Sequence, residues 1–165
     1  MAGIPVCDRV YVDESGVDHN DILDCCWTKK GTEVIGARSG KARGRTSVIA
    51  ALNDEAINAP MTYSGTMNTA LFLHWLQHLL VPSLVKGQVV IMDNAPIHKN
   101  SMVRTLIQDA GCKLLYLPAY SPDLNPIENY WAVMKKHIRK IRDQFDQVWD
   151  AIDTVLQNDK RYFIS

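Results

Sequence analysis

Apolar residues in the first third of the chain recur at the spacing of β-strands. Three short runs rich in β-branched, aromatic or other apolar residues, at residues 10–12, 21–28 and 46–52, are separated by stretches of turn-forming residues. Residues 13–16 and 29–31 are the clearest of these turns. Strands that are joined only by turns can pair antiparallel, so this part of the sequence predicts a three-stranded meander.

The rest of the chain alternates between helical and strand-like spacing. Apolar residues every three or four positions predict helices, and short uninterrupted apolar runs predict strands buried on both faces. The expected helices cover residues 71–80, 101–110, 126–142 and 145–156, and the expected strands cover residues 89–92 and 113–117. Strands separated by helices favour parallel pairing. The sequence therefore predicts an α/β fold with a mixed five-stranded sheet, three strands antiparallel and two parallel, and helices on both faces.

Length and composition narrow the class of protein. A chain of 165 residues suits a single domain spanning residues 1–165, and its 18 basic and 18 acidic residues leave no net charge that would indicate an acidic partner. The four cysteines form no Cys-x-x-Cys pair, which argues against a zinc finger and favours reduced thiols. No apolar stretch reaches the roughly 18 residues that cross a membrane, and the first residues lack the features of a signal peptide. We therefore expect an intracellular, soluble protein with no membrane partner.

Three acidic residues stand where the expected elements would bring ligands together. Asp13 and Asp93 each directly follow an apolar strand, and Glu128 opens the long helix after a proline-rich loop. Ligands of such sheets gather beyond the carboxyl ends of the strands. Three carboxylates that face one crevice suit hard, oxygen-preferring cations such as Mg²⁺ or Mn²⁺.

Each of these acids also has a purely structural interpretation. Asp13 and Asp93 are both followed by residues that are typical of turns. Glu128 lies three positions after Asn125, with Pro126 as the first helical residue, which is the arrangement of a capping box. A capping role for Glu128 is compatible with metal binding if one carboxylate oxygen stays free. From the individual motifs alone, both interpretations stay open.

Three segments taken together resemble one family. They are Val-Tyr-Val-Asp-Glu-Ser-Gly at 10–16, Val-Ile-Met-Asp-Asn-Ala-Pro-Ile-His at 90–98 and Leu-Pro-Ala-Tyr-Ser-Pro-Asp-Leu-Asn-Pro-Ile-Glu-Asn-Tyr-Trp at 117–131. In this order, and with 34 residues between Asp93 and Glu128, they are similar to the three catalytic segments of mariner-like and related bacterial insertion-sequence transposases. The resemblance extends over nearly the whole chain, and the proline-rich third segment is its most specific part.

The resemblance implies a ribonuclease H-like catalytic domain in which Asp13, Asp93 and Glu128 form an Asp-Asp-Glu triad. It implies two Mg²⁺ ions at that triad, with Mn²⁺ as a substitute, and DNA as the partner, both as transposon ends and as target. The reaction would be cleavage of transposon-end DNA and transfer of the 3′-hydroxyl into target DNA, with a homodimer as the active form. Asn94 and His98 would bond a metal-bound water or the scissile phosphate. The alternative is an ordinary loop asparagine and a partly exposed histidine.

Relatives of this kind usually carry N-terminal helix-turn-helix modules that read the transposon ends, and the residues before Val10 are too few for one. We therefore expect a catalytic domain without its DNA-recognition domain, in the bacterial cytoplasm beside the nucleoid or in a eukaryotic nucleus. Two other functions stay open. One is a ribonuclease H-type or resolvase-type nuclease without strand transfer. The other is a domesticated, non-catalytic DNA-binding remnant, against which the presence of all three acids argues.

Two groups of basic residues are candidate contacts to DNA phosphates. The first lies in a glycine-rich loop at residues 36–45, which could follow a DNA backbone or simply form a solvated hairpin tip. The second lies on the long helix within about 40° of the direction of Glu128 and could equally be an ordinary solvated face. Beside it runs an apolar stripe of expected core residues, which are Ile127, Trp131, Met134, Ile138 and Ile141. The two groups are Arg38, Lys41, Arg43 and Arg45 in the loop and Lys135, Arg139 and Arg142 on the helix.

Overall fold

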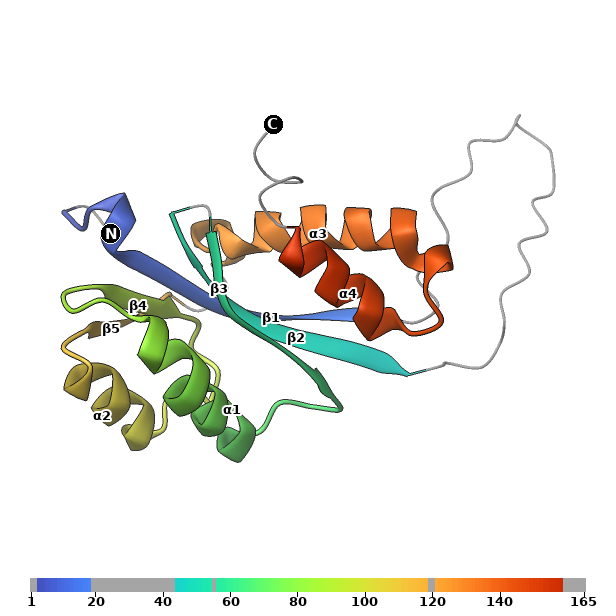
Figure 1. Cartoon of the computed structure of the whole chain (residues 1–165). Coiled ribbons are helices and arrows are strands. Elements are labelled where there is room, and N and C mark those ends of the chain that lie inside the picture. Colours follow the sequence, from blue (N-terminus) through green and yellow to red (C-terminus); the bar gives the residue numbers. More distant parts are fainter. Residues whose placement is uncertain (1–2, 19–43, 55, 119–120, 159–165) are drawn as a thin grey trace.

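The computed structural model describes residues 3–18, 44–54, 56–118 and 121–158, which form one sheet covered by helices (Figure 1). The strands are β1 (Arg9–Asp18), β2 (Arg45–Asn53), β3 (Ala56–Ser64), β4 (Val89–Met92) and β5 (Lys113–Tyr116). The helices are α1 (Thr69–Trp75), continued by a π-helical turn (Leu76–Leu80), α2 (Ser101–Asp109), α3 (Ile127–Ile141) and α4 (Val148–Gln157). Short 3-10 turns lie at Val6–Asp8, Val81–Ser83, Pro122–Leu124 and Arg142–Gln144.

The strand order in the sheet is β3-β2-β1-β4-β5. The pairs β1–β2 and β2–β3 are antiparallel, and the pairs β1–β4 and β4–β5 are parallel. The expected mixed α/β sheet is thus confirmed, with β1 at its centre. Within the described residues, no helix combines the length and the apolar character needed to cross a bilayer.

The third antiparallel strand is not the one that the sequence pattern predicts. It is β3, whereas the strand expected at residues 21–28 lies outside the described residues. β3 shows no apolar alternation, contains Pro60 and holds Ala59 at a φ of 50°. An edge strand tolerates such residues because one row of its backbone groups needs no partner in the sheet. Pairing with β2, and not a local sequence pattern, therefore defines this strand.

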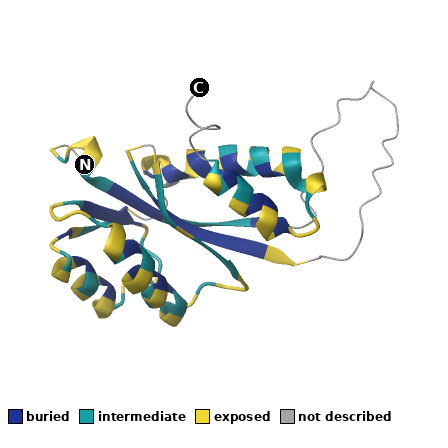
Figure 2. Ribbon diagram, viewed as in Figure 1, coloured by how far each residue is buried: buried dark blue, intermediate teal, exposed yellow. Residues whose placement is uncertain are grey.

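The two faces of the sheet carry different helices (Figure 1). Tyr11 and Val17 of β1 belong to the core under α3 and α4, whereas Val10 and Val12 belong to the core under α1 and α2. Figure 2 shows that the central part of the sheet is buried between these two layers. Because successive residues of a strand point to opposite faces, Asp13 lies on the side of α3. Glu14, the next residue of β1, therefore lies on the opposite side, towards α1.

β1 runs further than the sequence predicts. Residues 13–16, expected as a turn, lie inside this strand, so the expectation that Asp13 stands at the end of a strand is wrong. The reason is the pairing with β2, which continues as far as Asp18. The parallel pairing with β4 stops much earlier, at Tyr11 and Ile91. Asp13 therefore still lies just beyond the point where β1 and β4 cease to be paired.

The first turn of α3 differs from a capping box. The helix begins at Ile127 with Pro126 as its N-cap residue and no side-chain capping bond. Glu128 is exposed, and the Oδ1 atom of Asn125 is buried without a hydrogen-bond partner. The capping interpretation of Glu128 is therefore wrong. Four residues of the expected apolar stripe are confirmed as core, with at most 2% of each exposed: Ile127, Trp131, Met134 and Ile138. The fifth, Ile141, is half-buried and packs against the same core.

Candidate active site

The first turn of α3 brings Glu128 close to Asp13 of β1. Trp131, three residues after Glu128, donates its indole N–H to the Oδ2 atom of Asp13 over 3.0 Å. The Trp131 side chain is buried, so this bond fixes the first turn of α3 over the middle of β1. The apolar pattern of the helix predicts Trp131 only as a core residue. Its spacing from Glu128 places both side chains on neighbouring turns of one helix face.

The Asp13 carboxyl group stands in an environment that opposes its negative charge. Burial raises the pKa of Asp13 from 3.8 to about 7, and the negative charges of Glu128 and Glu14 act in the same direction. Hydrogen bonds from the Glu14 backbone and from Trp131 oppose the shift without cancelling it. A carboxyl group with a strongly raised pKa beside a second carboxylate is typical of a functional site. A bound cation would relieve both the burial cost and the repulsion.

Asp93 stands at the same end of the sheet as Asp13. Tyr11 and Ile91 are the last paired residues of β1 and β4, and Asp13 and Asp93 each lie two residues beyond them. The side chain of Asp93 is 54% exposed. Its Oδ1 atom accepts a hydrogen bond from the backbone N–H of Ala95 over 2.9 Å. The expectation that Asp93 follows a fully buried strand is confirmed, because all four residues of β4 are buried.

His98 lies between Asp93 and Glu14, an acidic residue that is not one of the three predicted metal ligands. Its Nδ1 atom is 2.6 Å from Oδ1 of Asp93, and its Nε2 atom is 3.2 Å from Oε1 of Glu14. Burial alone would lower the pKa of His98, but the bonds and charges of the two carboxylates outweigh burial and raise this pKa to about 9. The hydrogen bond from His98 is also the main reason why the pKa of Asp93 is lowered.

The position of Glu14 could have been predicted from the sequence. It follows Asp13 directly, so strand alternation places it on the opposite face of β1, towards the segment that carries His98. The interpretation of residues 13–16 as a turn concealed this alternation. His98 is 1% exposed, so the alternative of a partly exposed histidine is wrong.

Asn94 connects the loop after β4 to the end of β5. Its side-chain amide donates a hydrogen bond to the backbone carbonyl of Leu117. Tyr116 donates its hydroxyl hydrogen to the carbonyl of His98 over 2.7 Å. The segment between Asp93 and His98 is thus held from β5 at two points. The expected contacts of Asn94 and His98 with a metal-bound water or a phosphate stay predictions.

The three acids do not form a preformed metal-binding site. In the part of the chain that the structure describes, no three His, Cys, Asp or Glu side chains are arranged so that they would hold a metal ion as they stand. Asp13 interacts electrostatically with Glu128, and Asp93 lies on the neighbouring strand with one oxygen engaged by His98. A shared metal site for the three acids therefore stays a prediction.

The basic residues expected to contact DNA fall into different surroundings. Arg38, Lys41 and Arg43 lie outside the described residues. Arg45 begins β2, and its guanidinium lies so close to Gly16 of β1 that a Cβ atom there would be 1.9 Å from Arg45 Nε. Gly16 thus leaves room for the Arg45 side chain to lie across β1.

The three basic residues of the long helix also differ from one another. Lys135 is half-buried and Arg139 is exposed, both on α3. Arg142 follows α3 and donates a hydrogen bond from Nη1 to the carbonyl of Phe145, while its Nε atom is buried without a partner. Arg142 therefore stabilises the turn between α3 and α4, and only Lys135 and Arg139 have the surroundings expected of a phosphate contact.

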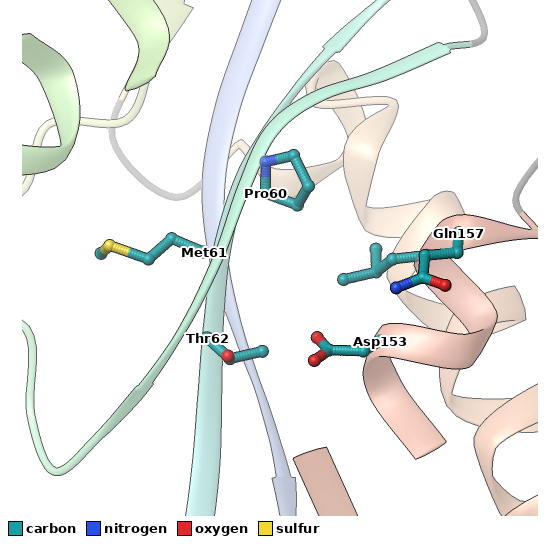
Figure 3. A pocket seen from close by; sticks show the side chains of 6 residues that line it. Pro60, Met61, Thr62, Asp153 and Gln157 are labelled. Carbon is teal, nitrogen blue, oxygen red and sulfur yellow. The ribbon is translucent and has the colours of Figure 1, made fainter. Parts of the chain in front are cut away.

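Two hollows lie on the described surface near the sheet. One, of about 380 Å³, is lined by Glu14, Arg45 and Tyr63 among others and adjoins the acidic end of the sheet. The other, of about 460 Å³, lies between β3 and α4, and Figure 3 shows Asp153 of α4 pointing towards the strand. Among the described residues that line this second hollow, Asp153 is the only acidic one, so they include no set of carboxylates for a cation.

Comparisons with known proteins identify the family of this chain. The model of the family described as DDE superfamily endonuclease matches residues 8–150. The transposable element Tcb2 transposase of Caenorhabditis briggsae is 35% identical over a stretch that covers 40% of this chain and 29% of the relative. The Tcb1 transposase of the same organism is 27% identical over 69% of this chain and 46% of the relative. This chain thus spans less than half the length of these curated relatives.

Solved structures share the fold. The Mos1 strand transfer complex gives a TM-score of 0.67 at 18% identity, covering 96% of this chain and 54% of that one. The catalytic core domain of BIV integrase gives a TM-score of 0.57 at 12% identity, covering 91% of this chain and 81% of that one. The sheet of this chain therefore has the ribonuclease H-like architecture of these neighbours. With its acidic sheet end, and with the family model matching most of its length, this chain belongs to the DDE superfamily endonucleases.

Proposed function

We propose that this chain is the catalytic domain of a DNA transposase, which cleaves transposon-end DNA and joins the 3′-hydroxyl to target DNA. The observation that carries the proposal is the half-buried Asp13 carboxyl group, whose pKa is raised to about 7 by desolvation and by the negative charge of Glu128. A structural role gives no reason to place two mutually repelling carboxylates here. A cation-dependent phosphoryl-transfer site does, because metal binding replaces the repulsion by shared coordination.

The chemistry of these donors fits a divalent cation. Asp13, Asp93 and Glu128 all offer carboxylate oxygens, which are the ligands that Mg²⁺ and Mn²⁺ prefer. These three residues would hold the ions, with Mn²⁺ able to substitute for Mg²⁺. Two such ions, when bound, supply activation of the attacking oxygen and stabilisation of the leaving oxygen during in-line displacement at phosphorus.

The protein's own residues orient the carboxylates. Trp131 holds Oδ2 of Asp13, and His98 and the Ala95 N–H both bond Oδ1 of Asp93. The described part of the chain offers no hydrogen-bond partner to Oδ2 of Asp93, so this oxygen remains available to a cation. Asp93 and Glu128 are both exposed, so a DNA strand can approach the acids from solvent.

DNA is the proposed partner, bound largely through its phosphates. Lys135 and Arg139 follow Glu128 along the same side of α3, so they would meet the backbone of a strand whose scissile phosphate lies at the acids. The Mos1 neighbours include paired-end complexes with a transposon end. We also propose that two copies of this chain act together, since joining two ends requires two active sites.

A strand-joining assay with Mn²⁺ tests this function against the alternative of a nuclease without strand transfer. Labelled oligonucleotides with a pre-cut 3′ end supply the strand, and a plasmid supplies the target. We expect joined products with the wild-type chain and none with Asp93→Asn, whose fold is checked by circular dichroism. Nicking without joining would support the nuclease alternative. Equal products from wild type and Asp93→Asn would refute the assignment of the acids, and DNA binding without either reaction would support a non-catalytic remnant.

A further inference from the structure

A buried histidine connects the two strands that carry the aspartates. His98 contacts Asp93 through Nδ1 over 2.6 Å and Glu14 through Nε2 over 3.2 Å. Glu14 belongs to β1, whereas Asp93 and His98 belong to the segment that follows β4. The three residues therefore form a continuous hydrogen-bonded chain across the end of the sheet, beyond the last backbone pairing of β1 with β4 at Tyr11 and Ile91.

The surroundings of His98 leave its ring little freedom to rotate. The ring is buried and packs against Phe72 of α1 with 4.5 Å between ring centroids. The backbone of His98 is held on both sides, because its N–H bonds the carbonyl of Ala95 and its carbonyl accepts the hydroxyl of Tyr116. A ring fixed at its backbone and its face defines the positions of the two carboxylates that it contacts.

The same contacts determine what His98 can do. Both ring nitrogens already bond carboxylate oxygens, so a contact from the ring to a phosphate would have to replace one of these bonds. As the residues stand, the effect of His98 on a cation site passes through Asp93. Histidines and carboxylates that orient metal ligands in this way commonly change metal affinity by 10-fold to 100-fold when they are removed.

We infer that His98 and Glu14 are positioning residues for the metal-binding carboxylates, an inference that rests on the proposed function. His98 keeps Oδ1 of Asp93 engaged, so Oδ2 is the oxygen that would be left to hold a cation. Glu14 keeps His98 in place from β1. Because Glu14 directly follows Asp13, the chain of contacts also sets the separation between Asp13 and Asp93 where the two strands are no longer paired.

Isothermal titration calorimetry with Mn²⁺, performed on the full chain without DNA, tests this role without relying on catalysis. Glu14→Ala removes the acceptor for Nε2, and we expect Mn²⁺ affinity to fall about tenfold or more. Glu14→Gln keeps an oxygen acceptor, so it should retain most of the affinity. Asp18→Ala is the matched control, because Asp18 is an exposed acid on the same strand and face as Glu14. The Mn²⁺ affinity of this variant should equal that of wild type.

A double variant separates positioning from a general loss of structure. We expect Glu14→Ala to change Mn²⁺ affinity little once His98→Gln is present, because both residues act through Asp93. Unchanged affinity in Glu14→Ala, with or without a lower melting temperature, would overturn the positioning role. Equal losses in Glu14→Ala and Asp18→Ala would also overturn it, since they would reflect charge alone.

The same titration distinguishes failure of this inference from failure of the proposed function. Asp93→Asn should abolish most Mn²⁺ binding. If Asp93→Asn loses affinity but Glu14→Ala does not, the metal site stands and the positioning role is wrong. If the wild-type chain binds no Mn²⁺, or Asp93→Asn binds it normally, the metal site itself is wrong and the positioning role fails with it.

Discussion

Trp131 of α3 donates its indole N–H to the carboxylate of Asp13 on β1, over 3.0 Å. This bond joins the helix that begins with Glu128 to the central strand of the sheet. It also places a neutral donor against a carboxyl group that lies near the negative charges of Glu128 and Glu14. The relative position of Asp13 and Glu128 therefore depends on a residue that hydrophobic patterning marks only as core.

The first prediction concerns the indole N–H of Trp131. Trp131→Phe keeps a buried ring but removes the donor, which should lower the free energy of unfolding by about 1–3 kcal/mol. Because Oδ2 of Asp13 would lose its orientation, Mn²⁺ affinity should also fall several-fold. Urea unfolding and Mn²⁺ titration measure the two effects separately.

Trp75→Phe is the matched control for this change. Trp75 is fully buried and donates its indole N–H to the carbonyl of Ala59 over 2.7 Å, a bond that involves none of the three acids. Trp75→Phe should lose stability to a similar extent while Mn²⁺ affinity stays at the wild-type value. If both variants lose affinity equally, the effect comes from weakened packing and not from the bond to Asp13.

The second prediction concerns the pH dependence of stability without divalent metal. The pKa of Asp13 is raised from 3.8 to about 7 in the folded chain, so the folded state holds a proton that the unfolded state has already released. The free energy of unfolding should therefore fall as the pH rises from about 4 to about 7, by up to about 4 kcal/mol from this group. Above that pH the contribution is constant.

Asp13→Asn tests this prediction, because an amide has no proton to lose. The variant should be more stable than wild type at pH 8 in the presence of a chelator, and the difference should shrink towards pH 4. Mn²⁺ should stabilise wild type at pH 8 but not Asp13→Asn. If the free energies of unfolding of the two proteins change in parallel between pH 4 and pH 8, Asp13 does not have the raised pKa.

The third prediction concerns the basic side of α3. Lys135→Ala combined with Arg139→Ala should weaken DNA binding for all sequences alike and reduce the salt dependence by about one for each lost phosphate contact. Lys136→Ala combined with Lys140→Ala removes the same charge from exposed positions that point roughly 80° and 120° away from Glu128. Equal losses of affinity in both double variants would mean that net charge, and not this side of α3, determines binding.

Much of this fold is predictable from the sequence because local patterns and tertiary structure agree. The apolar run before Asp93 and the helical stripe from Ile127 to Ile138 need no long-range information. The structure has β4 and α3 at these positions, and it also has the parallel strand β5 where the pattern predicts a strand. The proline-rich segment before Glu128 indicated the family, and the family model confirms that indication.

Features that depend on pairing partners were not predictable in this way. Residues 13–16 have turn-forming side chains, yet pairing with β2 extends them as part of β1. β3 forms at the sheet edge despite Pro60, because β2 offers it a partner. Strand alternation alone gives the side of β1 on which Glu14 lies, but the contact of Glu14 with His98, 84 residues away in the sequence, follows from no local spacing.

The most direct test of the central claim is the position of Mn²⁺ in a crystal of this chain. Anomalous diffraction from crystals soaked with Mn²⁺ should show density between the carboxylates of Asp13 and Asp93, with Glu128 completing the site, and Asp93→Asn crystals should lose that density. Manganese bound only elsewhere, or Asp13, Asp93 and Glu128 carboxylates found on opposite sides of the sheet, would contradict the assignment of these three residues as the metal-binding triad.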